Sequence, residues 1–455
     1  MGVCGRPYTP RMTNRLFAQA SRLDEVPGDS TGDRLALGLA PALTPSGLVD
    51  DPSFFHGFAA HPQVLARGLL TLADVTATRY FQFTPSTMRD PVLTAHGDRL
   101  RAECFSSCNS VYARLDLLAD AFDSGEMSHG TTNVDIGLAT RAALSRIGRD
   151  RLLHLDVGTD GLTVSQVEGA VVERPVEMPP RWVRALGNAA ELHHGLPLAF
   201  EMGAAGAKAF VAGLPAATSS PRNGWLVPSG TGVRVATRPT SGGVLVAGLH
   251  RLSAAKRLLP HLTGIAVYGR AEPGPVVVEL TVPGGRLVLG LTDEAWRGHS
   301  GEGALLGRLA SATVAEDADL VSALLAFEPV IDVPRLTREA ALDEPRVRDA
   351  LAVLAADGRV GWDLRDAAWF HRELPHDPER VEKDNPRLVT ARRLVADGAL
   401  SRAPEGWHVR SRSGGPDHLV SGDRCTCTWF LRHGTGRGPC AHMLAVRLVT
   451  HEEIA

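Results

Sequence analysis

The chain has 455 residues, of which 44% are hydrophobic and 22% charged, so it can form roughly two to four domains with buried cores and is not disordered throughout. Its net charge of −3 excludes a basic field over the whole chain, so any surface that attracts nucleic acid has to be local. No apolar run is long enough to cross a membrane, and the N-terminus lacks the apolar segment of a signal peptide; we therefore expect a soluble, cytoplasmic protein that does not contact membranes.

The N-terminal third divides into an arm and an α+β domain. Residues 1–50 are rich in Pro, Gly, Thr and Arg without a sustained period, which predicts an N-terminal arm. The domain at 51–175 begins with a helix over 62–78, where apolar residues recur at helical spacing. Short apolar runs, such as 100–105, predict strands after it. The polar, glycine-containing stretch 128–135 is predicted to be a loop between strands.

The next part, 176–330, is predicted to be a helical connector followed by a β-rich domain. A proline-rich break at 173–180 precedes it, and the alanine-rich stretch 182–214 favours helix. From 225 to 292 Val and Leu alternate between glycine turns, which is typical of strands. One basic helix, 253–259, is expected to interrupt them.

Residues 331–378 have the order of elements of a winged helix. Helices are predicted over 334–342 and 346–357, the second beginning at a proline and closed by a glycine. Strand-like runs at 359–364 and 368–373 follow, joined by a short polar turn. We therefore predict a multi-domain α+β protein with a β-rich middle region, a winged-helix-like segment and a small C-terminal zinc module.

The C-terminal region, 379–455, is predicted to be a linker followed by the zinc module, and its cysteines indicate the metal site. Three of the six cysteines fall within sixteen positions, and the pattern is C-x-C, twelve residues, then C-x-H. Structural zinc takes four nitrogen or sulfur ligands in a tetrahedron, and clustered cysteines outside secreted proteins favour metal over disulfides. The predicted zinc ligands are Cys425, Cys427, Cys440 and His442.

Local sequence supports a two-part site. On an extended strand, Cys425 and Cys427 would project to the same face because side chains alternate. Gly438 and Pro439 are typical of a helix start, which would place Cys440 where the helix dipole favours a thiolate. His433 is a rival fourth ligand, and we interpret it instead as a solvated loop residue.

This skeleton, with an aromatic pair after C-x-C and the run Arg437-Gly-Pro-Cys440, resembles the SWIM zinc finger in the form common in actinobacterial proteins. The segments 108–116, 129–135 and 248–252 also resemble parts of a bacterial family of SWIM-containing proteins. The resemblance implies a zinc ion but no reaction, because the function of that family is poorly defined. Ala441 departs from the basic residue that relatives often carry between the last Cys and His, which weakens a nucleic-acid contact at that position.

Other chemical signals lead to no reaction. Cys104 and Cys108 have no matching Cys/His pair nearby, and we interpret them as inert structural thiols. The stretch 298–302 nearly matches a nucleophile elbow, but Glu302 replaces the required glycine, so a surface loop is expected. Since no set of acid, base and nucleophile emerges, we interpret the chain as a binding protein rather than an enzyme.

Two kinds of partner stay open for the predicted zinc finger, DNA and another protein. Residues 401–450 hold seven arginines against three acids, a modest basic patch that a phosphate backbone could use. Arg432 and Arg437 lie between the two half-sites and are expected to point outward. The alternative function, implied by the resemblance alone, is a scaffold subunit of a multi-protein bacterial system that includes an AAA-type ATPase, without direct DNA binding.

Overall fold

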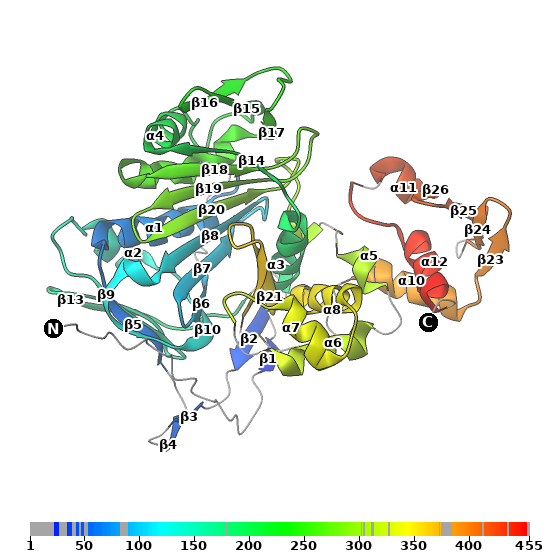
Figure 1. Ribbon diagram of the computed structural model, residues 1–455, viewed down its shortest axis with the longest axis horizontal. Coiled ribbons are helices and arrows are strands. Elements are labelled where there is room, and N and C mark those ends of the chain that lie inside the picture. Colours follow the sequence, from blue (N-terminus) through cyan, green and yellow to red (C-terminus); the bar gives the residue numbers. More distant parts are fainter. Residues whose placement is uncertain are drawn as a thin grey trace, which may run out of the picture.

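The computed structural model describes most of residues 53–452 (Figure 1). The gaps in this range are 82–89, 179, 302, 304, 311–313, 326–327, 373, 375–384, 412–413 and 435. Of the predicted N-terminal arm the structure describes only four strands: β1 (Arg22–Val26), β2 (Arg34–Gly38), β3 (Ala42–Thr44) and β4 (Gly47–Val49). The rest of that prediction lies outside the described residues.

An antiparallel sheet of eight strands is the centre of the molecule (Figure 1). Its members, in spatial order, are β10 (His129–Asn133), β6 (Val92–His96), β7 (Arg99–Phe105), β8 (Val111–Leu118), β20 (Gly285–Leu291), β19 (Val276–Val282), β18 (Gly264–Tyr268) and β14 (Leu198–Gly203). Strands from the predicted domains 51–175 and 176–330 meet where β8 pairs with β20. One sheet and one hydrophobic core therefore join these two predicted domains.

The sheet contains a repeat of topology that the sequence did not reveal. Helix α1 (Pro62–Ala77) precedes the meander β6–β7–β8, and the 3₁₀ helix η2 (Leu249–His261) precedes the meander β18–β19–β20. The last strands of the two meanders, β8 and β20, are antiparallel neighbours. Each half thus places a helix before three sequential strands, and the halves meet in the middle of the sheet.

Helices cover one face of this sheet. Helix α1 packs on β7 and β8, η2 on β19 and β20, and α4 (Ala204–Ala212) on β14 and β18. Gly68 allows the close approach of α1, because a Cβ there would lie 2.7 Å from the Leu115 side chain. The inner side of the sheet is therefore apolar and fully buried.

Two smaller sheets flank the large one. The five-stranded sheet contains β13 (Gly169–Glu173), β12 (Gly161–Gln166), β11 (His154–Gly158), β5 (Ser53–Ala59) and β9 (Phe122–Met127). The three-stranded sheet contains β16 (Gly232–Ala236), β15 (Gly224–Ser229) and β17 (Val244–Val246). Helix α2 (Leu138–Ser145) packs on α1 and β13. The predicted α+β class with a β-rich middle region is confirmed.

Two sequence-based assignments are wrong, and a third names a helix correctly but with bounds that are too short. The predicted loop 128–135 is largely strand β10, because its threonines pair with β6 at the sheet edge and are buried. The predicted helix 182–214 is divided: α3 (Pro180–His193) and α4 flank β14, which hydrogen-bonds to β18. The basic helix at 253–259 is part of the longer 3₁₀ helix η2. In the first two cases, tertiary pairing overrides local propensity.

The winged-helix-like segment has the predicted elements. After α6 (Val314–Leu324) come α7 (Val333–Ala340), α8 (Glu344–Ala356) and the hairpin β21 (Val360–Asp363)–β22 (Ala368–His371). Asp332 and Asp343 cap the two later helices by accepting hydrogen bonds from Arg335 N and Arg346 N. Helix α8 packs between α3, α6 and α7, and residues 350–358 are all buried. That half of α8 therefore cannot enter a DNA groove, as a recognition helix would.

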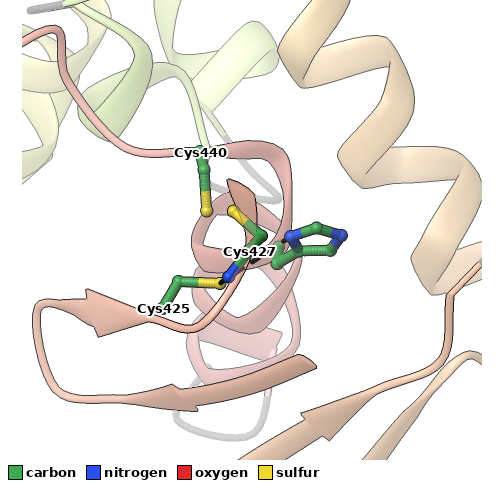
Figure 2. A group of neighbouring side chains, drawn as sticks. Cys425, Cys427 and Cys440 are labelled. Atoms are coloured by element: carbon green, nitrogen blue, oxygen red, sulfur yellow. Dashed lines mark hydrogen bonds between the residues drawn. The ribbon is translucent and has the colours of Figure 1, made fainter. Parts of the chain in front are cut away.

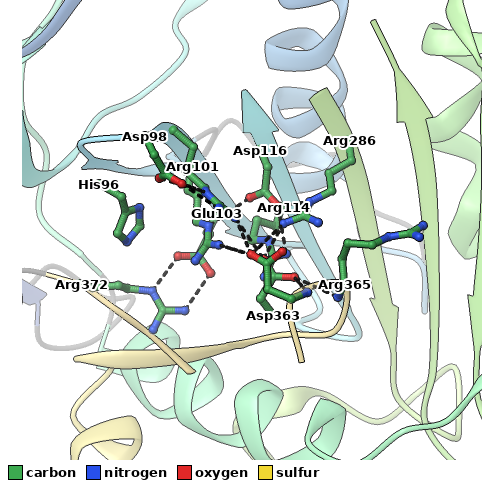
Figure 3. A network of polar contacts seen from close by, with 12 residues as sticks. His96, Asp98, Arg101, Glu103, Arg114, Asp116, Arg286, Asp363, Arg365 and Arg372 are labelled. Atoms are coloured by element: carbon green, nitrogen blue, oxygen red, sulfur yellow. Dashed lines mark hydrogen bonds and ion pairs between the residues drawn. The ribbon is translucent and has the colours of Figure 1, made fainter. Parts of the chain in front are cut away.

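The hairpin β21–β22 lies on the second face of the large sheet, where charged side chains hold it (Figure 3). Asp363 accepts hydrogen bonds from Arg101 (2.8 Å), Arg114 (2.8 Å) and Arg286 (2.7 Å) on three different strands. The Arg101 guanidinium also lies 3.8 Å from the ring centroid of Phe370 on β22. This face of the sheet is thus polar yet buried beneath the hairpin.

A second buried ion pair joins the hairpin to the same face of the large sheet. Arg372, directly after β22, donates to both carboxylate oxygens of Glu103 at 2.6 and 2.7 Å. Both side chains are fully buried, and Tyr112 Oη donates to the same carboxylate at 2.5 Å. Removing either partner would leave an uncompensated charge in the interior, which destabilises a protein strongly.

The C-terminal part shares a hydrophobic core with the winged-helix-like segment. Its elements are α10 (Pro386–Ala396), β23 (Leu400–Ala403), β24 (Gly406–Val409), β25 (His418–Ser421), β26 (Arg424–Cys425), α11 (Thr428–His433) and α12 (Ala441–Glu452). The four strands form one sheet, and α10 packs on α12. In the described part of the chain, no helix is long and apolar enough to cross a membrane.

Candidate metal centre

The four residues predicted as zinc ligands lie together. The Sγ atoms of Cys425, Cys427 and Cys440 and a ring nitrogen of His442 all fall within 4.8 Å of one another. Figure 2 shows the three thiols pointing into a common space. The three cysteines are buried and His442 is half-buried. In the described residues no other group of three or more His, Cys, Asp or Glu side chains is placed to hold a metal ion.

The first half-site differs from its prediction in local structure. Cys425 ends strand β26, but Cys427 is the N-cap of α11, and its Sγ accepts a hydrogen bond from Phe430 N at 3.4 Å. The two cysteines therefore lie at a strand-to-helix turn rather than on one extended strand. The turn still directs both thiols to the same point, because Cys427 N also donates to Cys425 Sγ at 3.4 Å.

The second half-site is a helix start, as predicted. Cys440 immediately precedes α12, and its carbonyl accepts from Leu444 N. The backbone of Gly438 has a φ angle of +71°, which residues other than glycine rarely adopt. This turn brings Cys440 and His442 to the other side of the site.

The donor set fits zinc in kind and in spacing. With zinc–sulfur bonds of about 2.3 Å and zinc–nitrogen bonds of about 2.0 Å, ligand atoms of a tetrahedron lie roughly 3.5–3.8 Å apart. The Cys425 Sγ to His442 Nδ1 distance is 3.7 Å. Backbone N–H groups that point at the sulfurs orient them as the outer partners of a metal site do. The cluster is therefore compatible with a closed Cys₃His zinc site.

Electrostatics favour a thiolate at Cys440. A hydrogen bond from the Cys425 thiol, together with hydrogen bonds from His442, Met443 N and Cys427, lowers the pKa of Cys440 to about 4 against the effect of burial. The same interaction, with burial, raises the pKa of Cys425. Since the thiolate is the form that binds metal, the cluster has a ligand ready at neutral pH.

The loop between the half-sites is held by the rest of the protein. Arg387 on α10 donates to the carbonyls of Arg437 (2.7 Å) and Pro439 (3.0 Å) and lies 4.6 Å from the ring centroid of Trp429. A Cβ at Gly438 would lie 2.0 Å from the carbonyl oxygen of Gly303. The loop therefore fits against 296–303, which follows the large sheet.

Arg437 does not point outward as predicted. Its guanidinium lies 5.2 Å from the ring centroid of Trp296, and its carbonyl is bound by Arg387. Arg297 donates to the carbonyl of Gly436 in the same loop. Arg437 thus takes part in the contact with the segment 296–303, whereas Arg432 on α11 is exposed.

Within this segment, the stretch 298–302 was predicted to be a surface loop, and this is wrong at His299. His299 is fully buried, its Nδ1 lies 3.0 Å from the carbonyl oxygen of Asn109, and its carbonyl accepts from Asn188. Ser300 N donates to Asn109 Oδ1 at 2.6 Å. The segment therefore connects the zinc module to the turn that carries Cys108. Nothing in the sequence reveals this link, because its residues are far apart along the chain.

His433 lies outside the four-residue cluster and packs against Trp429, with ring centroids 5.0 Å apart. His418 is closer to the site, and its ring centroid lies 4.4 Å from that of His442. The preference for His442 over His433 as fourth ligand therefore agrees with the geometry.

Two further cysteines of the described residues, Cys104 and Cys108, are not part of this cluster. Cys104 is buried on β7, where burial raises the pKa of its thiol well above the usual range. Cys108 lies on the turn after β7; burial would raise its pKa, but hydrogen bonds from Ser106, Ser110 and the backbone lower it overall. Both are free thiols.

We predict that Cys108→Ser leaves the zinc content unchanged, because Cys108 is not part of the metal cluster. The serine hydroxyl can accept the same local hydrogen bonds, so stability should change by less than about 1 kcal/mol. Metal analysis and thermal unfolding of the purified variant test this. A loss of zinc would show that the thiol takes part in metal binding.

Comparisons with known proteins add little. No family model matches the chain, and no curated protein matches it. Among solved structures, the chain is similar to the proliferating cellular nuclear antigen of Entamoeba histolytica, with 13% identity, a TM-score of 0.35 and coverage of 53% of this chain and 99% of the other. It is also similar to the PCNA2–PCNA3 complex of Sulfolobus tokodaii, with 10% identity, a TM-score of 0.37 and the same coverage. Both scores are too low to establish a common fold or function.

Proposed function

We propose that this chain is a zinc-dependent interaction protein whose C-terminal part is a structural zinc module of the SWIM type. The observation that carries the proposal is the convergence of three thiols and one imidazole within 4.8 Å. Four protein ligands would close the coordination sphere, which is typical of structural rather than catalytic zinc. When bound, the ion supplies a rigid cross-link; Cys425, Cys427, Cys440 and His442 would hold it.

The zinc module presents one free surface for a partner. The loop with Arg437 packs against the protein itself, whereas β26 and α11 carry exposed arginines. Arg424 and Arg432 are exposed there, and neither forms an ion pair with any carboxylate in the described residues. These two cations favour contact with phosphates that is independent of base sequence, so nucleic acid is the first partner that we propose for this surface.

The test is a titration of DNA with wild-type protein and with Arg424→Ala/Arg432→Ala. We expect the variant to bind about tenfold more weakly at low salt, and its log affinity to fall less steeply with log salt by about 2, because each phosphate contact contributes about 0.9 to that slope. Zinc content should not change, since neither arginine is a ligand. Fluorescence anisotropy at several salt concentrations measures both quantities. Equal salt slopes for both proteins would remove nucleic acid from the proposal for this surface.

One observation favours a protein partner instead. Leu431, between Phe430 and Arg432 on α11, is 75% exposed. With the half-buried aromatic residues Trp429 and Phe430 beside it, Leu431 is an apolar group that a protein partner could cover. A pull-down from a bacterial lysate with and without nuclease separates the two partners, and Leu431→Ala should weaken capture only of a protein. The scaffold function would then be the better proposal.

A further inference from the structure

A row of helices on the inner face of the large sheet is strongly basic. Helices α2, α1, η2 and α4 pack side by side in that order (Figure 1). Their sequences contain a single acidic residue, Asp74. Their basic residues outside the core are Arg67, Arg141, Lys208, Lys256 and Arg257. The chain as a whole is acidic, so this excess of positive charge is local.

Part of this charge is neutralised and part is free. Asp74 pairs with Arg141 at 2.9 Å and with Arg257 at 2.5 Å. Among the described residues, Lys208 and Lys256 form no ion pair, and both are exposed. Arg149, in the loop after α2, is also exposed and likewise forms none in the described part of the chain. The free cations therefore come from three separate elements.

The basic residues lie on elements that pack against one another, because α1 contacts both α2 and η2, and η2 contacts α4. The pKa of the His261 imidazole, at the end of η2, is lowered first by burial and then by the positive charges of four basic groups: Arg67, Arg149, Lys208 and His61. These groups belong to α1, to the loop after α2, to α4 and to the residue before α1. Such a concentration of positive charge raises the local concentration of anions and favours the approach of a polyanion.

We propose that the surface formed by α1, η2, α4 and the loop 146–149 binds the phosphate backbone of nucleic acid. The surface favours nucleic acid over a membrane or a protein partner because its described residues expose no large apolar side chain. In the described residues, none of the large hydrophobic side chains that are exposed lies on α1, η2 or α4. Helices that lie in a membrane interface carry apolar residues opposite their cations, and the centres of protein interfaces are rich in aromatic side chains. A phosphate backbone requires only cations.

This inference goes beyond the proposed zinc function, because the surface belongs to the first hydrophobic core and the zinc ligands to the second. The zinc proposal and the nucleic-acid proposal can therefore be tested independently. A variant that loses zinc should keep its affinity at the helices, and a variant of the helices should keep its zinc.

The experiment uses the full chain and two charge-matched variants. Lys208→Ala/Lys256→Ala removes two exposed cations from the proposed surface. Arg338→Ala/Arg348→Ala removes two exposed cations from α7 and α8 and is the control. A labelled DNA duplex of mixed sequence and a labelled single-stranded RNA are the probes, titrated at several salt concentrations. Circular dichroism and zinc content verify that each variant is folded.

We expect the first variant to bind about tenfold more weakly than wild type and to lose about 2 in the slope of log affinity against log salt, with the control unchanged. Equal affinity of the two variants would overturn the proposal. It would also be overturned if wild type bound neither probe at low salt, or if it bound vesicles of phosphatidylserine and phosphatidylcholine but no nucleic acid. Weaker binding in Arg424→Ala/Arg432→Ala alone would place nucleic acid at the zinc module instead.

Discussion

Replacing Cys440 with serine is expected to abolish stable zinc binding and to unfold the C-terminal module. A serine hydroxyl is not ionised at neutral pH, so it cannot replace a thiolate, and three remaining donors leave the coordination sphere open. Zinc contributes roughly 10–16 kcal/mol to the folding of small zinc modules. Cys425, Cys427 and Cys440 also lie in the second hydrophobic core, so loss of the ion should loosen the packing of α12 on α10.

Metal analysis and differential scanning calorimetry measure this result. We expect zinc to fall from a single ion per chain to a small fraction, and limited proteolysis to cleave within 400–450. The first core, which holds the large sheet, should unfold at its wild-type temperature because it shares no residue with the second. Cys108→Ser is the matched control. Protein purified without chelator that carries no zinc would contradict the assignment of the site.

The second large effect is expected at the interface between the hairpin and the large sheet. Asp363→Asn keeps the shape of the side chain but removes the negative charge that Arg101, Arg114 and Arg286 share. Removing one partner of a buried ion pair costs about 3–5 kcal/mol. The free energy of unfolding should therefore fall by roughly that amount, and the hairpin should separate from the sheet first.

Calorimetry and hydrogen exchange of β21 and β22 measure this loss. Asp98→Asn is the control, because Asp98 pairs with Arg99 at a position where its side chain is 45% exposed. Its replacement should cost about 1 kcal/mol or less. If both variants lose equally little stability, the network does not hold the hairpin.

The same network makes stability depend on pH. Burial alone would raise the pKa of the Asp363 carboxyl, but Arg114, Arg101 and Arg286 lower it well below its usual range. A carboxyl whose pKa is depressed by folding stabilises the protein above its unfolded pKa, about 3.9, and this contribution is lost as pH falls toward the folded pKa. Wild type should therefore lose stability below about pH 4, whereas Asp363→Asn should lose less over the same range.

The metal cluster was predictable because its information is local. Two half-sites, each spanning three residues, carry all four donors, and Gly438 and Pro439 specify the turn between them. The order of helices and hairpin at 331–378 was predictable for the same reason, since caps and periodic apolar residues define each element. Segments that become strands only by pairing with distant strands, as β10 and β14 do, were assigned to the wrong kind of element from local sequence.

By itself the sequence determined the class of the protein, the helices and strands with clear caps or alternation, and four residues suited to zinc. Only the tertiary structure decided which elements pack against one another. Arg101, Glu103 and Arg114 alternate with apolar residues, a pattern typical of strands with one face in solvent. Their side chains are nonetheless buried, because a hairpin from more than 200 residues later in the chain supplies Asp363 and Arg372 as partners. The alternation indicates which face of each strand is polar but not which segment covers it, whereas zinc ligands two residues apart are recognisable in the sequence itself.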